Sequence, residues 1–483
     1  MGEKSSISLS VQAVSGVKWS SISQVGRQGM QLVTTIVLAR LLSPSDFGLV
    51  GMAMVVIGFV AIFKDLGTSA AVIQRKELSE ELLSSIFWVN AAFGLVATVV
   101  LAVVAPLAAT FYHEPRIIPI LGFLSLTFFI SGLSILQQAI LERGMAFNKL
   151  AKLEIIATLL GSMVGIGSAI LGFGVWSLVY QLLAVVTVST VLLWTSSGWK
   201  PKMNFHWAEV KSVSSYSLNL TGFNIFNYFA RNADYLLIGR FLGAQNLGYY
   251  TLSYNIMLYP LLNISAVIGR VMFPVYSQLQ SDDVSFRNIY MKVAGAISII
   301  TFPMMLGIIV IAEPFVLGVF GSQWSPVIIL LLILSPIGII QSVGTTVGAI
   351  YQAKGRTDWM LRWGVVAGLL IILSFVIGLQ WGIVGVATAY AIVSIILIYP
   401  CFAIPFKLIN MPVRDLSSVL SRPFLCSLTM FLSLLGLKYV LPISLSNVMA
   451  LAILISTGII TYLSVSWVIN REQLRQIWYV IKG

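Results

Sequence analysis

Long apolar segments recur along the whole chain and are separated by short polar connections. Each segment has about 20 residues, which is enough for a helix to cross a hydrocarbon core of ~30 Å. Backbone in lipid must satisfy its own hydrogen bonds, so segments of this length should be helical. We predict about fourteen transmembrane helices, at residues 17–42, 47–73, 83–110, 117–141, 152–172, 175–196, 215–242, 247–275, 290–312, 327–351, 361–380, 383–406, 420–440 and 446–469.

An internal repeat at an offset of 200 residues divides the chain. Residues 36–48 read IVLARLLSPSDFG and residues 236–248 read LLIGRFLGAQNLG, with a shared Arg, Leu and Gly. Each copy ends the first span of a six-span unit, and six spans return the chain to its starting side. Two six-helix lobes in a parallel repeat are therefore expected, related by an axis along the membrane normal. The predicted parts are an N-lobe (1–200), a C-lobe (201–410), and two additional helices with a tail (411–483).

Polar side chains follow one face of the first span in each lobe. The stripe in the C-lobe consists of Asn224, Asn227, Arg231 and Asp234. The corresponding stripe in the N-lobe consists of Gln24, Arg27, Gln31 and Thr34. Polar groups at these spacings share a helix face, and they are costly against acyl chains, so we expect both stripes to line a cleft between the lobes. The neighbouring spans add Lys64, Asp65, Asn255, Tyr259, Asn263 and Arg270.

Hydrogen bonding between helices is an alternative explanation for the stripes. Such bonds contribute only ~0.6 kcal/mol on average, and Asn and Gln form them readily. Asp234 follows Arg231 by one helical turn, and Asp65 adjoins Lys64. Each carboxylate can therefore neutralise its neighbour or couple transport to an ion, and both interpretations remain open at this level.

Basic residues are distributed unevenly over the predicted connections. Of the 29 Lys and Arg residues, 21 fall in the termini and the even-numbered loops, and four fall in the odd-numbered loops. This asymmetry follows the positive-inside rule and predicts that both termini are cytoplasmic. The net charge of +12 is then explained by topology and anionic lipid, so no nucleic-acid partner is expected. Only 10% of residues are charged, far below the share that a soluble domain needs.

Residues that could support catalysis are sparse. His113 and His206 fall in loops on opposite sides of the predicted membrane, so they cannot share a metal ion or a catalytic triad. Cys401 and Cys426 lie in or near spans without the spacing of metal ligands. The sequence contains no Gly-x-x-x-x-Gly-Lys-Ser/Thr phosphate loop. A transporter without a metal or cofactor is therefore expected rather than an enzyme.

Five stretches carry a resemblance to a known family. They read LARLLSPSDFGLVGMA (38–53), DLGTSAAVIQRKELSEE (65–81), QQAILERGMAFNKLAKLE (137–154), LGFGVWSLVYQLL (171–183) and GRVMFPVYSQLQ (269–280). The chain resembles the polysaccharide-exporter branch of the multidrug/oligosaccharidyl-lipid/polysaccharide (MOP) superfamily. Within that branch it is most similar to Wzx-type lipid-linked oligosaccharide flippases of the colanic-acid exporter type.

The resemblance implies a monomeric, multi-pass flippase of the bacterial inner membrane. It would move undecaprenyl-pyrophosphate-linked sugar units to the periplasmic leaflet by alternating access, beside the polymerase and glycosyltransferases of surface polysaccharide biosynthesis. Membrane lipids and the lipid-linked oligosaccharide are the expected partners. In this hypothesis the phosphates or acidic sugars bind Arg27, Lys64, Arg231 and Arg270. The Asn, Gln and Tyr side chains bind sugar hydroxyls, and Asp65 or Asp234 couples the cycle.

Two other functions remain as alternatives. A drug/cation antiporter of the same superfamily would favour an acidic cavity, whereas four basic and two acidic residues stand at these positions in the spans. A membrane-embedded polysaccharide polymerase or ligase would favour a large outer loop with catalytic residues, and the predicted outer loops are short.

Overall fold

The computed structural model describes residues 2–62, 72, 78–203, 205–206, 218–442, 444–471 and 473. Within helices, the side chains of residues 2–18, 20–22, 218–226, 260, 262–271 and 273–274 are not described. Lys64 and Asp65 therefore lie outside the described residues. The same holds for the side chains of Asn224, Asn263 and Arg270, although their backbone is helical.

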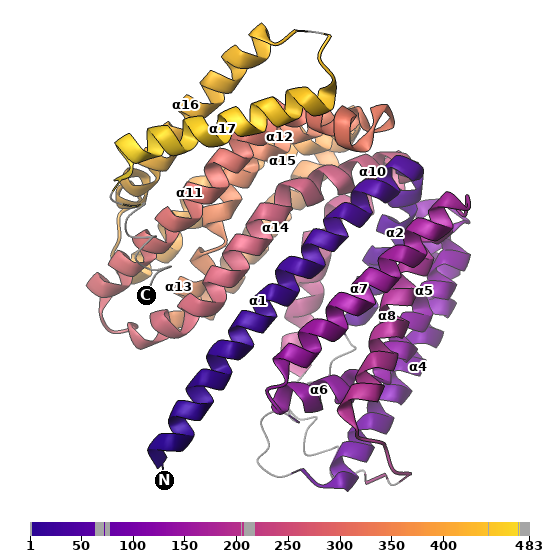
Figure 1. Cartoon of the computed structure of the whole chain (residues 1–483). Helices are drawn as coiled ribbons and strands as arrows, with labels where there is room; N and C mark the ends of the chain where they lie inside the picture. The colour runs from indigo at the N-terminus through magenta and orange to yellow at the C-terminus, as the bar shows by residue number, and fades with distance from the viewer. Residues whose placement is uncertain are drawn as a thin grey trace. The chain divides into compact units, whose positions relative to one another are not determined.

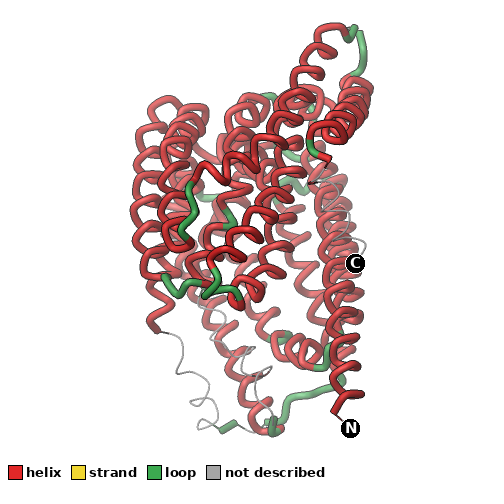
Figure 2. Tube along the Cα trace, turned by 90° about the vertical axis from the view of Figure 1, so that its left-hand side faces the viewer, coloured by secondary structure: helices red, strands yellow, loops and turns green. Residues whose placement is uncertain are grey.

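Helices make up the regular structure of the described residues (Figure 2). The chain forms two compact units, Met1–Gly248 and Tyr249–Gly483. The first unit contains α1 (Gly2–Leu41), α2 (Pro44–Ala61), α4 (Glu80–Tyr112), α5 (Ile117–Gly132), α6 (Ile135–Arg143), α7 (Phe147–Ile170) and α8 (Trp176–Ser197). The chain passes from one unit to the next within α10 (Leu218–Gln278). The second unit continues with α11 (Asp283–Phe315), α12 (Pro326–Gly344), α13 (Val347–Ala353), α14 (Thr357–Gly378), α15 (Gly382–Phe406), α16 (Val413–Val440) and α17 (Asn447–Ile469). Short 3-10 or π segments are Val316–Phe320, Ser322–Trp324, Leu379–Trp381 and Lys407–Ile409.

Among the described residues, nine segments are long and apolar enough to span a membrane, and the bent pair α5–α6 makes a tenth. One of the nine, Thr357–Ile409, contains both α14 and α15 and hence two predicted spans. The helices α1 and α10 do not pass the same test, and these are the helices that carry the polar stripes. The prediction of an all-α, multi-pass membrane protein is confirmed. The total of fourteen spans and the cytoplasmic position of the termini stay predictions.

The predicted spans match the helices closely except at two places. The predicted span 117–141 is divided into α5 and α6, which are bent by 41° relative to each other. The predicted span 327–351 is divided into α12 and α13. The break predicted between the seventh and eighth spans is present, because α10 consists of two helices that meet at a kink at Gly243, where φ is 82°. Glycine adopts this conformation without the steric cost that a Cβ brings.

The connection between α1 and α2 is encoded locally. The Ser43 side chain accepts a hydrogen bond from the Asp46 backbone, and the Asp46 carboxylate accepts one from the Ser43 backbone at 2.9 Å. This reciprocal capping box satisfies backbone donors that a helix start leaves unpaired. Pro44 stands in the first turn, where its missing N–H costs nothing. These residues determine where α2 begins and hence the direction that the chain takes after α1.

Small residues bring the helices of the first unit close together. There α4 packs against α5, α7 against α8, and α1 against α7 (Figure 1). A Cβ on Gly94 would lie 2.6 Å from the Phe128 carbonyl oxygen, and one on Gly161 would lie 2.3 Å from the Val185 side chain. Close approach of this kind lets dispersion forces hold helices together where lipid removes the hydrophobic driving force.

The helix α11 organises the second unit. It packs against α12, α16 and α17. Tyr462 on α17 donates a hydrogen bond to the Ile299 carbonyl of α11 at 2.7 Å, in a buried setting. Cys426 and Met430 of α16 are buried in the same cluster. The two C-terminal helices are thereby docked on α11.

Helices α2 and α10 meet at positions related by the 200-residue offset. A Cβ on Gly48 would lie 1.7 Å from the Ala244 carbonyl oxygen, and a Cβ on Gly248 would lie 1.9 Å from the Pro44 carbonyl oxygen. Gly48 aligns with Gly248 and Pro44 with Ala244. The contact is therefore reciprocal, as at an interface with a two-fold axis. Only glycine allows it, because both obstacles are backbone atoms.

We expect the substitution Gly48→Ala to lower the free energy of unfolding by ~1–3 kcal/mol, because the added methyl group forces two helices apart. The matched control is Gly122→Ala on α5, where a Cβ would meet nothing within 4 Å. Thermal unfolding of both variants in the same detergent provides the measurement. Equal stability of the two variants would contradict the close contact at Gly48.

Candidate substrate-binding cavity

A cavity of about 410 Å³ lies within the first unit. Its walls come from five helices, α1, α2, α5, α7 and α8. The apolar part of the wall consists of Met54, Ile57, Leu124, Leu182, Val185 and Val186. The polar part consists of Gln24, Arg27, Gln28, Gln31, Thr127, Thr158 and Gln181. Amide and hydroxyl groups around one cation, inside a membrane-spanning unit, form a site that can hold a polar, anionic group.

Helix α1 supplies most of the polar wall. The predicted stripe residues Gln24, Arg27 and Gln31 lie together on it, as their spacing of one turn requires. Gln28, between them, also lines the cavity. The stripe predicted from the sequence does not include Gln28, because Gln28 falls outside the 3-4-3 spacing on which that stripe was defined.

The fourth residue of the stripe, Thr34, serves a different purpose. Its side chain is buried and is not part of the cavity wall. The hydroxyl bonds to Ser162 of α7 at 2.8 Å and to the Met30 carbonyl at 2.8 Å. Thr34 therefore joins α1 to α7, which is the helix-to-helix alternative considered for the stripe.

Arg27 is held by groups on two helices. Its Nη2 donates to Gln24 Oε1 on α1 at 2.6 Å. Its Nη1 lies 3.7 Å from Glu154 Oε2 on α7. The same Glu154 oxygen accepts a hydrogen bond from the Ser23 hydroxyl at 2.5 Å. In the sequence, Glu154 stands near Lys152 at the inner end of a predicted span, which favours an interfacial position. Nothing local links it to α1, so the sequence does not mark it as a site residue.

Gln181 is the other polar residue that sequence reasoning missed. It comes from α8 and lines the same cavity as the α1 residues. In the sequence it stands alone in the apolar run LVYQLL, so no spacing pattern marks it. The one sequence feature that could have marked Gln181 as a candidate cavity residue is its uncharged amide within a long apolar segment.

The C-lobe stripe lies on α10. Asp234 is buried, with an exposed fraction of 3%, and its Oδ1 accepts a hydrogen bond from the Tyr235 backbone at 2.9 Å. Asn227 is half-buried and Arg231 is exposed. In the second unit, Asn255 and Tyr259 are exposed. The shared function of these residues with the α1 stripe stays a prediction.

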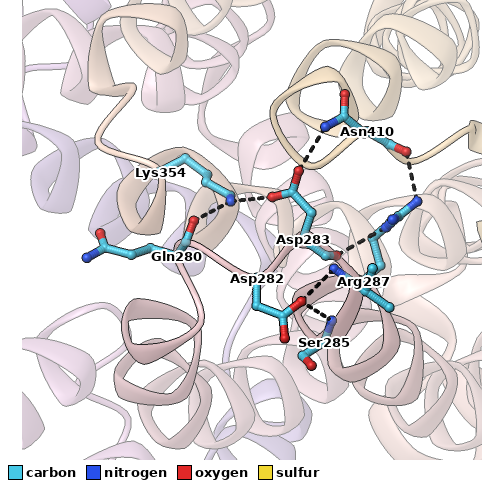
Figure 3. Close-up of polar contacts among 8 residues, drawn as sticks. Gln280, Asp282, Asp283, Ser285, Arg287, Lys354 and Asn410 are labelled. Atoms are coloured by element: carbon cyan, nitrogen blue, oxygen red, sulfur yellow. Dashed lines mark hydrogen bonds and ion pairs between the residues drawn. The ribbon is translucent and has the colours of Figure 1, made fainter.

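A polar cluster joins three connections at one end of the second unit (Figure 3). We call it the Asp283 cluster; its members are Asp283, Arg287, Lys354 and Asn410. Lys354 Nζ bonds to Asp283 at 2.6 Å and to the Gln280 carbonyl at 2.5 Å. Asn410 donates to the other Asp283 oxygen at 2.8 Å and accepts from Arg287 at 3.0 Å through its carbonyl. The start of α11, the end of α13 and the connection before α16 are thus tied together.

The first unit contains a corresponding Glu80 cluster, formed by Glu80, Ser84 and Lys202. Lys202 pairs with Glu80, which raises the pKa of Lys202 through the hydrogen bond between them. The backbone N–H of Lys202 also donates to the Ser84 hydroxyl at 3.1 Å. Glu80 and Ser84 precede Asp283 and Arg287 by the same 203 residues. Both units therefore fix the start of the equivalent helix, α4 or α11, in a similar way.

Similarity to solved structures defines the class of fold. The structure of "Lipid II flippase MurJ, inward closed conformation" matches with a TM-score of 0.73 over 95% of this chain and 100% of that chain, at 16% identity. An inward-facing multidrug resistance MATE transporter of the MOP superfamily matches with a TM-score of 0.63 over 80% of this chain and 94% of that one, at 17% identity. The chain therefore has the fold shared by these membrane transporters.

Sequence similarity then defines the family. The family described as "Polysaccharide biosynthesis protein" matches residues 37–329, and this chain belongs to it. The lipopolysaccharide biosynthesis protein WzxC of Escherichia coli is 31% identical over 81% of this chain and 80% of its own length. The teichuronic acid biosynthesis protein TuaB of Bacillus subtilis is 29% identical over 94% of this chain and 95% of its own length. The resemblance inferred from the sequence is confirmed.

We expect Lys354→Met to lower the free energy of unfolding by ~1 kcal/mol, because it removes a half-buried ammonium group that bonds to Asp283 and to a backbone carbonyl. Lys407→Met is the control, since Lys407 is exposed. Thermal unfolding in detergent, followed by tryptophan fluorescence, measures both. A loss that is equal in the two variants would mean that the Asp283 cluster does not stabilise the second unit.

Proposed function

We propose that this protein is a flippase that moves undecaprenyl-pyrophosphate-linked oligosaccharide units across the bacterial inner membrane. The observation that carries the proposal is the cavity around Arg27, which combines one cation with amides and hydroxyls inside a membrane-spanning unit. The relatives' names point the same way, since they include a lipopolysaccharide biosynthesis protein and a "Probable low-salt glycan biosynthesis flippase" of Haloferax volcanii.

The chemistry of the substrate explains why the cavity has this composition. A sugar-pyrophosphate head carries negative charge and many hydroxyl groups, and moving it through ~30 Å of hydrocarbon without partners is prohibitive. The Arg27 guanidinium matches phosphate geometry through paired N–H donors. Gln24, Gln31 and Gln181 offer both donors and acceptors to sugar hydroxyls. The prenyl chain needs no such partner and stays in lipid.

The proposed transport cycle is alternating access between two lobes. The lobes are 1–200 and 201–410 in a parallel repeat, with 411–483 attached and both termini in the cytoplasm. Two observations support this repeat: the reciprocal contact of Gly48 and Gly248, and the matching Glu80 and Asp283 clusters. Arg231, Arg270 and Lys64 are proposed as further cations on the substrate's path, and Asp65 or Asp234 as the coupling group.

The remaining polar residues of the stripes complete the proposal. Asn224, Asn227, Asn255, Tyr259 and Asn263 are proposed to bind sugar hydroxyls as the head passes. The protein acts as a monomer and receives its substrate from glycosyltransferases, and a polymerase consumes it on the far side. This order follows from the chemistry, because the sugar unit is built before it is flipped and is joined to others afterwards.

Arg27→Ala is expected to reduce flipping at least ten-fold, because it removes the cavity's cation and leaves the pyrophosphate uncompensated. The measurement is the transfer of a fluorescent prenyl-pyrophosphate-linked oligosaccharide between leaflets of vesicles that contain the purified protein. Arg414→Ala is the matched control, since Arg414 is exposed and lies outside the cavity.

Two results would overturn the proposed function. One is transfer by the wild-type protein no faster than in empty vesicles. The other is transport of an organic cation driven by an ion gradient, with no effect on the lipid probe, which would identify a drug/cation antiporter instead.

A further inference from the structure

Glu154 is the one carboxylate within ion-pair distance of Arg27 among the described residues. It stands about two turns into α7, at the end of the stretch QQAILERGMAFNKLAKLE. It is not on the cavity wall itself, whereas Arg27 is. Glu154 can therefore act on the charge of Arg27 without forming part of the cavity wall.

The geometry of the pair is loose. The Arg27 and Glu154 atoms are 3.7 Å apart, beyond ordinary hydrogen-bond distance, and the two side chains are 38% and 36% exposed. The Gln24 bond uses one guanidinium proton, at 2.6 Å. A guanidinium group has five N–H donors. Arg27 therefore keeps free donors with which it can bind an entering anion.

Glu154 has a second partner of its own. The Ser23 hydroxyl donates to Oε2 at 2.5 Å, so the carboxylate remains hydrogen-bonded when its distance to Arg27 grows. Thr158, one turn further on α7, bonds to the Glu154 backbone carbonyl at 2.8 Å and lines the cavity. The carboxylate is thus placed beside the binding position without depending on Arg27 alone.

We propose that Glu154 is an internal counter-ion of Arg27, which the anionic group of the substrate displaces. In the empty cavity Glu154 neutralises the guanidinium, whose uncompensated charge would be costly in the membrane. On binding, the diphosphate takes the free donors of Arg27 and the pair with Glu154 opens. Glu154 then repels the bound anion at close range and favours its release. The residue therefore sets affinity and release; this inference rests on the proposed function.

A purely structural ion pair makes the opposite prediction. If Glu154 only joined α7 to α1, its loss would loosen α1 and weaken every ligand of the cavity. The contact between Thr34 and Ser162 already joins the same two helices. A carboxylate in competition with the ligand must instead weaken binding, so its removal must tighten it.

The test uses the full-length protein in lipid nanodiscs with two probes. Binding of inorganic pyrophosphate measures how Glu154 competes with an anion for Arg27. Binding of a fluorescent prenyl-pyrophosphate-linked disaccharide tests the proposed substrate. The variants are Glu154→Gln, Arg27→Ala and the double variant. Glu142→Gln on α6 is the control, since its carboxylate accepts a hydrogen bond from Gln138 and lies outside the cavity.

Glu154→Gln is expected to bind both probes ~2- to 5-fold more tightly, the range of a partly exposed ion pair, and to release them more slowly. In the Arg27→Ala background the same substitution should change nothing, because the competition runs through Arg27. Glu142→Gln should bind as the wild type does.

Unchanged or weaker binding by folded Glu154→Gln would overturn the inference, and so would an equal gain without Arg27. The two probes separate this failure from that of the proposed function. If pyrophosphate shows the effect of Glu154→Gln and the lipid probe does not bind, the counter-ion stands and the proposed substrate is wrong.

Discussion

A guanidinium group inside a membrane-spanning bundle has to keep a counter-charge and hydrogen-bond acceptors within reach, and the first unit is arranged around this requirement. Arg27 meets it with Gln24 from its own helix and Glu154 from α7. The cost of an unmatched charge in hydrocarbon explains why α1, α7 and α8 each contribute polar side chains to the wall of one cavity. A site that neutralises its own cation in the empty state can exchange that partner for an anionic ligand.

The rest of each unit holds this arrangement in place by packing and by polar ties at the helix ends. Glycines let α4 meet α5 and α7 meet α8 at backbone distance. The Glu80 and Asp283 clusters fix the start of α4 and of α11 against neighbouring connections.

Helical periodicity was enough to predict most helices and the shared face of Gln24, Arg27 and Gln31, since both depend on neighbours one or two turns away. Tertiary partners were not predictable. Thr34 belongs to the same stripe by spacing, yet it bonds to Ser162 on another helix. Glu154 is separated from Ser23 by 131 residues, and no local pattern joins them.

The central claim is that the cavity of the first unit receives the pyrophosphate of a lipid-linked oligosaccharide. Photo-crosslinking tests it directly, with a reactive group placed next to the pyrophosphate of a prenyl-linked disaccharide and the modified peptides identified by mass spectrometry. The account predicts crosslinks on the cavity face of α1, around Gln24, Gln28 and Gln31, that excess unlabelled lipid-linked disaccharide abolishes. Crosslinks confined to outward-facing apolar residues such as Val103 and Leu107 of α4, unaffected by the competitor, would contradict it.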